Sequence, residues 1–301
     1  MNILSLEGGG TRGVMQATIL NALPNAQWGL IAGTSVGSIV GGCKALDIDP
    51  LPFFTKWAPT IFSNGRWLMP RLWSSAKYSA EPLRIALTEV VGDKTLADCK
   101  IPFIAVGFEM KTGRVAYFQS YGQSSTNGDE IVIGPDSKMP MVDVMMASSA
   151  AQSYFPGHSW GAYLFWDGGS SGLNVPDMLT ISEAQEIFNP GLQMLSIGNG
   201  KTPWPFAGKD MTNPGIATVA EATVSIAYSG PEDSQVWLAR QTLGARYYRL
   251  DPAISDYAID DASPDTLAAM QGAALAALKD QPAIVGVFNP RQTDDQDEPI
   301  Q

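Results

Sequence analysis

The fold is decided by residues 31–40, which read Ile31-Ala32-Gly33-Thr34-Ser35-Val36-Gly37-Ser38-Ile39-Val40. Residues 29–32 form a short apolar run that is typical of a strand buried on both faces. Residues 36–46 are rich in small side chains and predict a buried helix. The junction has the spacing G-x-S-x-G, in which glycines allow a sharp strand-to-helix turn. We therefore expect the hydroxyl of Ser35 to project above the sheet, flanked by Gly33, Thr34, Val36 and Gly37.

The same stretch allows two other interpretations. Glycine recurs every fourth residue, at Gly29, Gly33, Gly37 and Gly41. Residues 28–46 could therefore be a membrane helix with a G-x-x-x-G face, although their central Thr and Ser residues disfavour it. The segment could also be a glycine-lined helix packed on a sheet, with Ser35 inert. Only a catalytic partner for Ser35 separates this last interpretation from a nucleophile.

Composition restricts both the architecture and the partners. With 301 residues, 45 % of them hydrophobic, the chain can bury a large core. We expect a single domain over residues 1–290 and an acidic, flexible tail over residues 291–301. The net charge of −11 argues against a nucleic-acid partner, because a phosphate backbone requires a basic surface. The two cysteines form neither a metal-ligand set nor a disulfide framework.

The sequence also carries an expectation about location. No basic and apolar leader precedes the first motif, so we expect no Sec signal peptide. Without a transmembrane segment, a cytoplasmic or peripherally membrane-associated protein is expected.

A second glycine-rich turn lies near the start of the chain. Residues 2–6 predict a buried strand, and they lead into Gly8-Gly9-Gly10-Thr11-Arg12-Gly13 and a helix over residues 14–23. Such a turn presents backbone N–H groups to an anion. The spacing also fits the dinucleotide fingerprint G-x-G-x-x-G, but the next strand ends in Ser35 and lacks the acidic residue that binds ribose. An oxyanion hole beside Ser35 is the better interpretation.

Residues 49–81 differ in composition from their surroundings. They carry seven aromatic side chains and four basic ones, and no acidic residue lies between Asp49 and Glu81. Aromatic and basic residues together favour the headgroup level of an anionic membrane, which predicts peripheral membrane contact through residues 52–78. Alternatively, residues 50–80 form a cap whose aromatic side chains belong to the core.

The remaining elements alternate between strands and helices. Strands are expected over residues 101–108, 115–118, 163–166 and 192–197, and helices over residues 82–91, 142–151, 217–229, 234–243 and 264–278, the last capped by Ser263. This order predicts an α/β fold with a mainly parallel sheet, in which ligands bind at the carboxyl ends of the strands. Glu7, Ser35, Asp167 and Gly198 all follow predicted strand ends.

A serine nucleophile needs a base. The chain has one histidine, His158, and it precedes Asp167, whereas hydrolase triads of this fold class place the histidine last. Asp167 is the stronger candidate because it ends a strand and is followed by Gly168 and Gly169. The alternative is an ordinary Asp-Gly turn with no catalytic role.

The three motifs, in this order, resemble those of the patatin-like phospholipase family. Weaker similarities include residues 147–158, 195–200 and 246–251, so the resemblance spans roughly residues 2–280. Two positions depart from the usual pattern: Glu7 stands where the family often has Asp, and Asn199 where it often has Thr.

The resemblance implies a three-layer sandwich with helices on both faces of the sheet. It also implies a Ser35–Asp167 dyad, an oxyanion hole built from Gly8, Gly9, Gly10, Arg12 and Gly13, no metal and no cofactor. The expected activity is phospholipase A-type hydrolysis of glycerolipid acyl esters. Two alternatives stay open: an acyltransferase that uses the same acyl-enzyme, and a lipid-binding or storage protein with incidental esterase activity.

Overall fold

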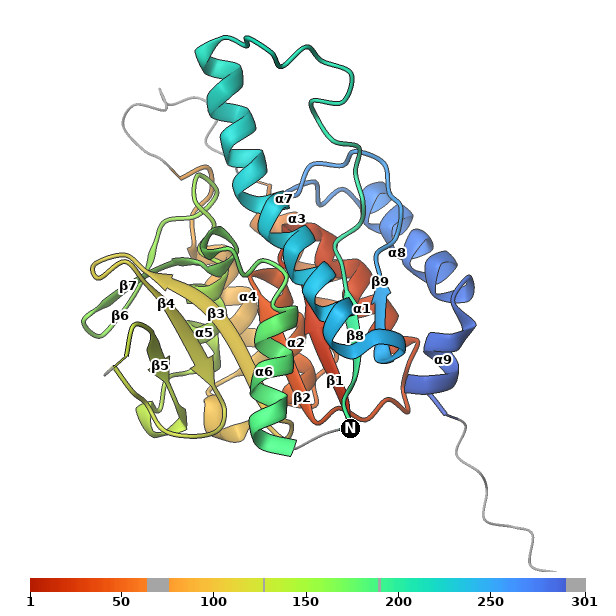
Figure 1. Ribbon diagram of the computed structural model, residues 1–301. Coiled ribbons are helices and arrows are strands. Elements are labelled where there is room, and N and C mark those ends of the chain that lie inside the picture. The colour runs from red at the N-terminus through yellow and green to blue at the C-terminus, as the bar shows by residue number, and fades with distance from the viewer. Residues whose placement is uncertain (64–75, 127, 189–190, 291–301) are drawn as a thin grey trace, which may run out of the picture.

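One mixed sheet forms the centre of the molecule, with strand order β5-β4-β3-β2-β1-β8-β9 (Figure 1). The computed structural model describes residues 1–63, 76–126, 128–188 and 191–290. The parallel part of the sheet consists of β1 (Asn2–Leu6), β2 (Leu30–Thr34), β3 (Phe103–Glu109), β8 (Gln193–Ile197) and β9 (Tyr247–Leu250). The chain therefore has the mainly parallel α/β sheet that the sequence predicted.

Antiparallel strands extend the sheet beyond β3. Both β4 (Arg114–Gln119) and β7 (Tyr163–Asp167) pair with β3 in the antiparallel sense. β5 (Ile131–Ile133) runs parallel to β4, and β6 (His158–Trp160) forms a hairpin with β7. The pairing of β7 with β3 brings the end of β7 close to the end of β2.

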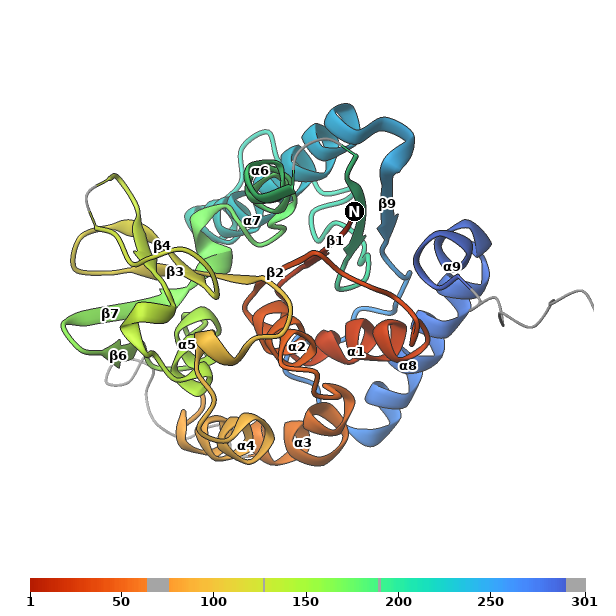
Figure 2. The same cartoon turned by 90° about the horizontal axis from the view of Figure 1, so that it is seen from below.

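Helices cover both faces of the sheet (Figure 2). On one side lie α6 (Asp177–Phe188) and α7 (Ile216–Leu243); on the other lie α1 (Gly13–Asn21), α2 (Val36–Ala45), α5 (Met141–Ser148) and α8 (Pro264–Lys279). The helices α3 (Ala58–Ile61), α4 (Glu81–Val91) and α9 (Pro282–Phe288) lie outside this second layer.

The central strands are apolar on both faces because each face is covered by helices. Ile3, Leu30 and Ile104 pack into the smaller core under α6 and α7, whereas their neighbours Leu4 and Ile31 belong to the larger core under α1 and α2. All five residues of β2 are buried. The predicted three-layer arrangement is therefore present.

The structure contradicts one alternative interpretation and one predicted helix break. Residues 28–46 are not a membrane helix but β2 followed by α2, and no helix in the described residues is long and apolar enough to cross a membrane. The two helices predicted over residues 217–229 and 234–243 are one helix, α7, which continues through Pro231. A proline removes one hydrogen bond from a helix, and the loss of this bond at Pro231 was not enough to end α7.

The predicted cap lies partly outside the described residues, which omit residues 64–75. The predicted tail over residues 291–301 lies entirely outside them. In the described part, Phe53, Phe54 and Tyr78 are buried, as the core interpretation predicted. The two described lysines are paired with carboxylates, Lys56 with Glu89 and Lys77 with Asp260. Membrane contact through this segment stays a prediction.

Candidate active site

Ser35 lies at the sharp turn between β2 and α2, with φ 55° and ψ −125°. This positive φ is unusual for a residue with a side chain and stores local strain of about 1–3 kcal/mol. Only 9 % of Ser35 is exposed to solvent, and it lines a cavity. The strand-turn-helix geometry that the sequence predicted for this serine is therefore present.

Glycine is required on both sides of Ser35 because backbone atoms occupy the space of a side chain. A Cβ on Gly33 would lie 2.2 Å from the carbonyl oxygen of Gly37. A Cβ on Gly37 would lie 2.2 Å from the carbonyl oxygen of Leu6, at the end of β1. The elbow thus packs directly against the strand that leads into the first glycine-rich turn.

A second serine, which the sequence analysis did not single out, supports the elbow. The N–H of Ser35 donates a hydrogen bond to Oγ of Ser148 at 3.0 Å. The hydroxyl of Ser148 in turn donates to the carbonyl of Val106 on β3 at 2.6 Å. Ser148 is fully buried at the end of α5, so it connects the turn at Ser35 to the centre of the sheet.

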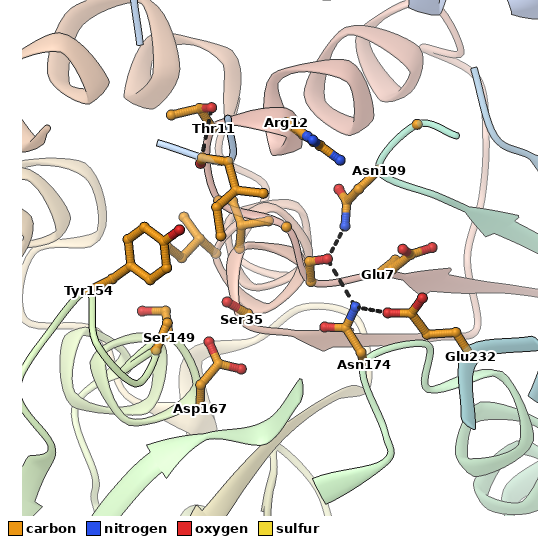
Figure 3. Close-up of a pocket in the computed structure, with 18 of the residues that line it drawn as sticks. Glu7, Thr11, Arg12, Ser35, Ser149, Tyr154, Asp167, Asn174, Asn199 and Glu232 are labelled. Carbon is orange, nitrogen blue, oxygen red and sulfur yellow. Dashed lines mark hydrogen bonds between the residues drawn. The ribbon is translucent and has the colours of Figure 1, made fainter. Parts of the chain in front are cut away.

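Asp167 ends β7 and lies next to Ser35, with its carboxylate directed toward the serine (Figure 3). Its Oδ1 accepts a hydrogen bond from the N–H of Gly169 at 2.7 Å. Burial raises the pKa of Asp167 to about 6, and hydrogen bonding from Ser35 and Gly169 opposes that rise. A carboxylate with this pKa is ionised at neutral pH and can accept a proton.

The glycine-rich turn lies above Ser35, and Gly10 adopts a positive φ of 61°. The backbone N–H groups of this turn differ in whether they have a hydrogen-bond acceptor. That of Gly8 donates to the carbonyl of Asn174 at 3.1 Å, whereas those of Gly9 and Gly10 have no protein acceptor in the described part of the chain. Among the glycines predicted to form an oxyanion hole, Gly9 and Gly10 are therefore the two whose N–H groups no described protein atom accepts.

Arg12 and Gly13 have other contacts. Arg12 donates to the carbonyl of Tyr257, which anchors the turn to the segment before α8. The N–H of Gly13 bonds within the turn, and a Cβ there would lie 2.4 Å from Val36 and 2.8 Å from Phe54. Neither residue presents a free backbone N–H to Ser35. Both therefore support the shape of the turn and do not supply a backbone donor to the predicted oxyanion hole.

His158 is separate from this site. Its Nε2 lies 3.0 Å from Oδ1 of Asp143, which also accepts from Arg84 at 3.1 Å. The histidine is buried on β6, and among the described residues its side chain makes no hydrogen bond to Ser35 or Asp167. The geometry therefore offers Asp167, and not His158, as the partner of Ser35.

The cavity around Ser35 has a volume of about 1010 Å³ and two chemically different parts. The apolar part is lined by Phe53, Phe54, Ala58, Ile61, Phe62 and Leu83. The polar part is lined by Glu7, Arg12, Asn174, Asn199, Glu232, Arg249 and Asp251. A cavity with both an apolar and a polar part can hold an amphipathic molecule with its reactive group near Ser35.

A buried ionic network forms the base of the polar part. Arg249 on β9 pairs with Glu7 and with Asp251, and it donates to Oγ of Ser196 at 2.9 Å. Burial raises the pKa of Glu7, although the neighbouring positive charge of Arg249 opposes the rise. From the sequence, Glu7 stood out only because it follows a predicted strand end and departs from the family pattern. The network fixes the strand end from which the glycine-rich turn begins.

Comparison with known proteins identifies the family. Residues 4–179 match the family model described as patatin-like phospholipase, and this segment includes all three motifs. The chain belongs to the patatin-like phospholipase family.

Members of the family that are similar to this chain include bacterial and plant proteins. A cGAMP-activated phospholipase of Pseudomonas aeruginosa is 28 % identical over 285 residues, covering 89 % of this chain and 81 % of that protein. Patatin-like protein 1 of Arabidopsis thaliana is 26 % identical over 187 residues, covering 52 % of this chain and 43 % of that protein. This chain thus spans less than half of the plant relative. VipD from Legionella pneumophila matches with a TM-score of 0.43 and 10 % identity, covering 93 % of this chain and 67 % of that one.

Proposed function

We propose that this protein is a phospholipase A-type lipid acyl hydrolase that uses Ser35 as nucleophile and Asp167 as general base. Family membership supports lipid acyl hydrolysis in the broad sense. The observation that carries the finer proposal is the placement of Ser35, on a strained elbow, beside a buried carboxylate in a cavity that is partly apolar and partly polar.

The proposed reaction has two stages. Oγ of Ser35 attacks the ester carbonyl while Asp167 accepts its proton, and the N–H groups of Gly9 and Gly10 bind the resulting oxyanion. The ester C–O bond then breaks, and the departing alkoxide takes the proton from Asp167. In the second stage, water loses a proton to Asp167 and attacks the acyl-Ser35 ester. The bond between the acyl carbon and Oγ of Ser35 then breaks, Oγ takes the proton back from Asp167, and the fatty acid is released.

The shape of the cavity supports a glycerolipid substrate. The aromatic and aliphatic side chains of its apolar part, such as Phe54, Ile61 and Leu83, suit an acyl chain. The polar part around Arg12 suits a glycerol backbone and its headgroup. Because one relative is named a cGAMP-activated phospholipase, every assay includes an arm with added cyclic GMP–AMP.

Replacing Asp167 by Asn tests the proposal. We expect kcat for fatty-acid release from phospholipid vesicles to fall about 10²- to 10⁴-fold, because the amide cannot accept the proton of Ser35. The wild-type rate should rise with pH and reach half its plateau near pH 6, since only the ionised form of Asp167 is a base. This dependence on pH should be absent from the residual rate of D167N.

The same substitution should stabilise the fold. The pKa of Asp167 is raised from 3.8 to about 6, so ionisation at neutral pH opposes folding, and this cost is absent at acidic pH, where the native carboxyl is protonated. At about 1.4 kcal/mol per pKa unit, the free energy of unfolding of D167N should exceed that of the wild type by up to about 3 kcal/mol at pH 7.

Asp143→Asn is the control for the activity measurement, because Asp143 faces Arg84 and His158 and not Ser35. Equal rates for D167N and D143N would contradict the proposal.

Two other outcomes identify the alternatives. Transfer of the acyl group to an added alcohol, in preference to water, would indicate an acyltransferase. Unchanged lipid binding by the Ser35→Ala variant, together with negligible turnover by the wild type, would indicate a binding protein.

A further inference from the structure

Two asparagine side chains converge on one backbone carbonyl of the glycine-rich turn. Nδ2 of Asn174 donates to the carbonyl of Gly8 at 3.2 Å, and Nδ2 of Asn199 donates to the same oxygen (Figure 3). Asn174 follows the acidic motif in the chain, and Asn199 follows β8. We refer to Asn174 and Asn199 as the asparagine pair.

Asn174 forms hydrogen bonds with both backbone polar groups of Gly8. Its backbone carbonyl accepts the N–H of Gly8 at 3.1 Å, while its side chain donates to the carbonyl of Gly8. Its Oδ1 is also the atom that a Cβ on Gly8 would meet at 2.4 Å and a Cβ on Gly169 at 2.7 Å. One residue thus contacts both the glycine-rich turn and the motif that carries Asp167.

Neighbouring side chains fix the orientation of both amides. Gln16, fully buried on α1, donates from Nε2 to Oδ1 of Asn199 at 3.2 Å, which leaves Nδ2 directed at Gly8. Oε1 of Glu232 on α7 accepts from Nδ2 of Asn174 at 2.6 Å. Each amide therefore has a defined donor end, set by a partner from a different helix.

These contacts determine the orientation of the next peptide group. In a trans peptide the C=O of one residue and the N–H of the following residue point in opposite directions, and the described residues contain no cis peptide bond. With the carbonyl of Gly8 held by the asparagine pair, the N–H of Gly9 must point away from the pair. Ser35 is close by, since a Cβ on Gly8 would lie 2.9 Å from Cβ of Ser35.

We propose that Asn174 and Asn199 are positioning residues, which hold the Gly8–Gly9 peptide so that the N–H of Gly9 faces the oxyanion formed at Ser35. This inference rests on the function proposed above. It assigns the asparagine pair a role in stabilising the transition state without contact with the substrate. The expected effect of losing one amide is therefore smaller than that of losing an oxyanion donor, which is about 10²- to 10³-fold in kcat.

Kinetics with ground-state and transition-state ligands test the proposal. We expect Asn174→Ala and Asn199→Ala each to lower kcat about 10- to 100-fold with KM unchanged. Affinity for a trifluoromethyl-ketone phospholipid analogue, which forms an oxyanion on Ser35, should fall by the same factor. Affinity for an ether-linked phospholipid, which forms none, should stay within twofold of the wild type.

Three further variants complete the design. Glu232→Gln keeps an oxygen acceptor for Asn174 and should retain most of the activity, whereas Glu232→Ala should behave like Asn174→Ala. Asn21→Ala removes an equivalent amide that bonds to Asp49 on the surface, and it should leave every parameter unchanged. If Asn174→Ala does not fold, the same measurements on Asn199→Ala carry the test.

Two results would overturn the inference. Equal losses for the ketone and the ether lipid would mean that the asparagine pair only maintains the pocket. Full activity of the folded variants would mean that the Gly9 N–H needs no such support. Failure of the proposed function is distinguishable, because in that case Ser35→Ala would itself retain activity in the same assay.

Discussion

Ser35→Ala is expected to lower fatty-acid release from phospholipid vesicles about 10⁴- to 10⁶-fold, leaving no turnover above background. The variant keeps Asp167, the glycine-rich turn and the cavity, but it has no oxygen to form the acyl-enzyme. Alanine carries the same Cβ at the strained φ of 55°, so the elbow and its hydrogen bond to Ser148 should be retained. The measurement is the rate of fatty-acid release, with circular dichroism to establish that the variant is folded.

Ser149 provides the matched control. It is a second buried serine that lines the same cavity, but its hydroxyl donates to the carbonyl of Met145 at 2.6 Å. Ser149→Ala should therefore retain most of the wild-type rate. A large loss in Ser149→Ala with little loss in Ser35→Ala would show that the nucleophile has been assigned to the wrong serine.

Gly37→Ala is expected to have the largest effect on stability. The new methyl group would lie 2.2 Å from the carbonyl oxygen of Leu6 and 2.9 Å from that of Glu7. Because both are backbone atoms of the central strand and the turn that follows it, no side-chain rotation can relieve the overlap. We expect a loss of about 3 kcal/mol in the free energy of unfolding, measured by urea denaturation.

Gly272→Ala is the control with the opposite sign. Gly272 lies within α8, and a Cβ there would have no atom within 4 Å among the described residues. Alanine should stabilise this helix by about 0.5–1 kcal/mol, because glycine loses more backbone entropy on folding. Equal stability for Gly37→Ala and the wild type would contradict the close packing of the elbow on β1.

The elbow and the motif order could be predicted because they depend on local backbone requirements. A strand-to-helix turn this sharp excludes a Cβ at Gly33 and Gly37, so the requirement is visible as glycines at fixed spacing. The helix at residues 264–279 was also predictable, and the expected N-cap is confirmed, since Oγ of Ser263 accepts from the N–H of Thr266. In these cases the physical cause lies within a few residues of its effect.

The hydrogen bonds that support the site could not be predicted, because each joins residues that are distant in the chain. Ser148 meets Ser35 across 113 residues, and Asn199 meets Gly8 across 191. No spacing or periodicity marks such pairs, because only the sheet order brings them together. The occupied N–H of Gly8 has the same origin: its acceptor, Asn174, is remote in sequence, so a glycine-rich turn alone does not show which of its donors are free.

The predicted helices and strands were wrong where local sequence signals conflicted with tertiary packing. A break was predicted between residues 229 and 234, yet α7 continues through this stretch, which contains Pro231. The short strand β5 and the helix α6 were not predicted, although α6 packs against the central strands and buries Ile181 and Ala184 in the smaller core. Their weak periodicity is overridden by packing on the sheet.

The most direct test of the account is to trap the acyl-enzyme. The protein is mixed with a p-nitrophenyl ester of a short fatty acid, quenched in acid within the first turnover and digested, and the modified peptide is located by mass spectrometry. The account predicts one acyl group per chain, on Ser35, and no modification in the Ser35→Ala variant. An acyl group on Ser149 or another residue, or steady turnover without any acyl-enzyme, would contradict it.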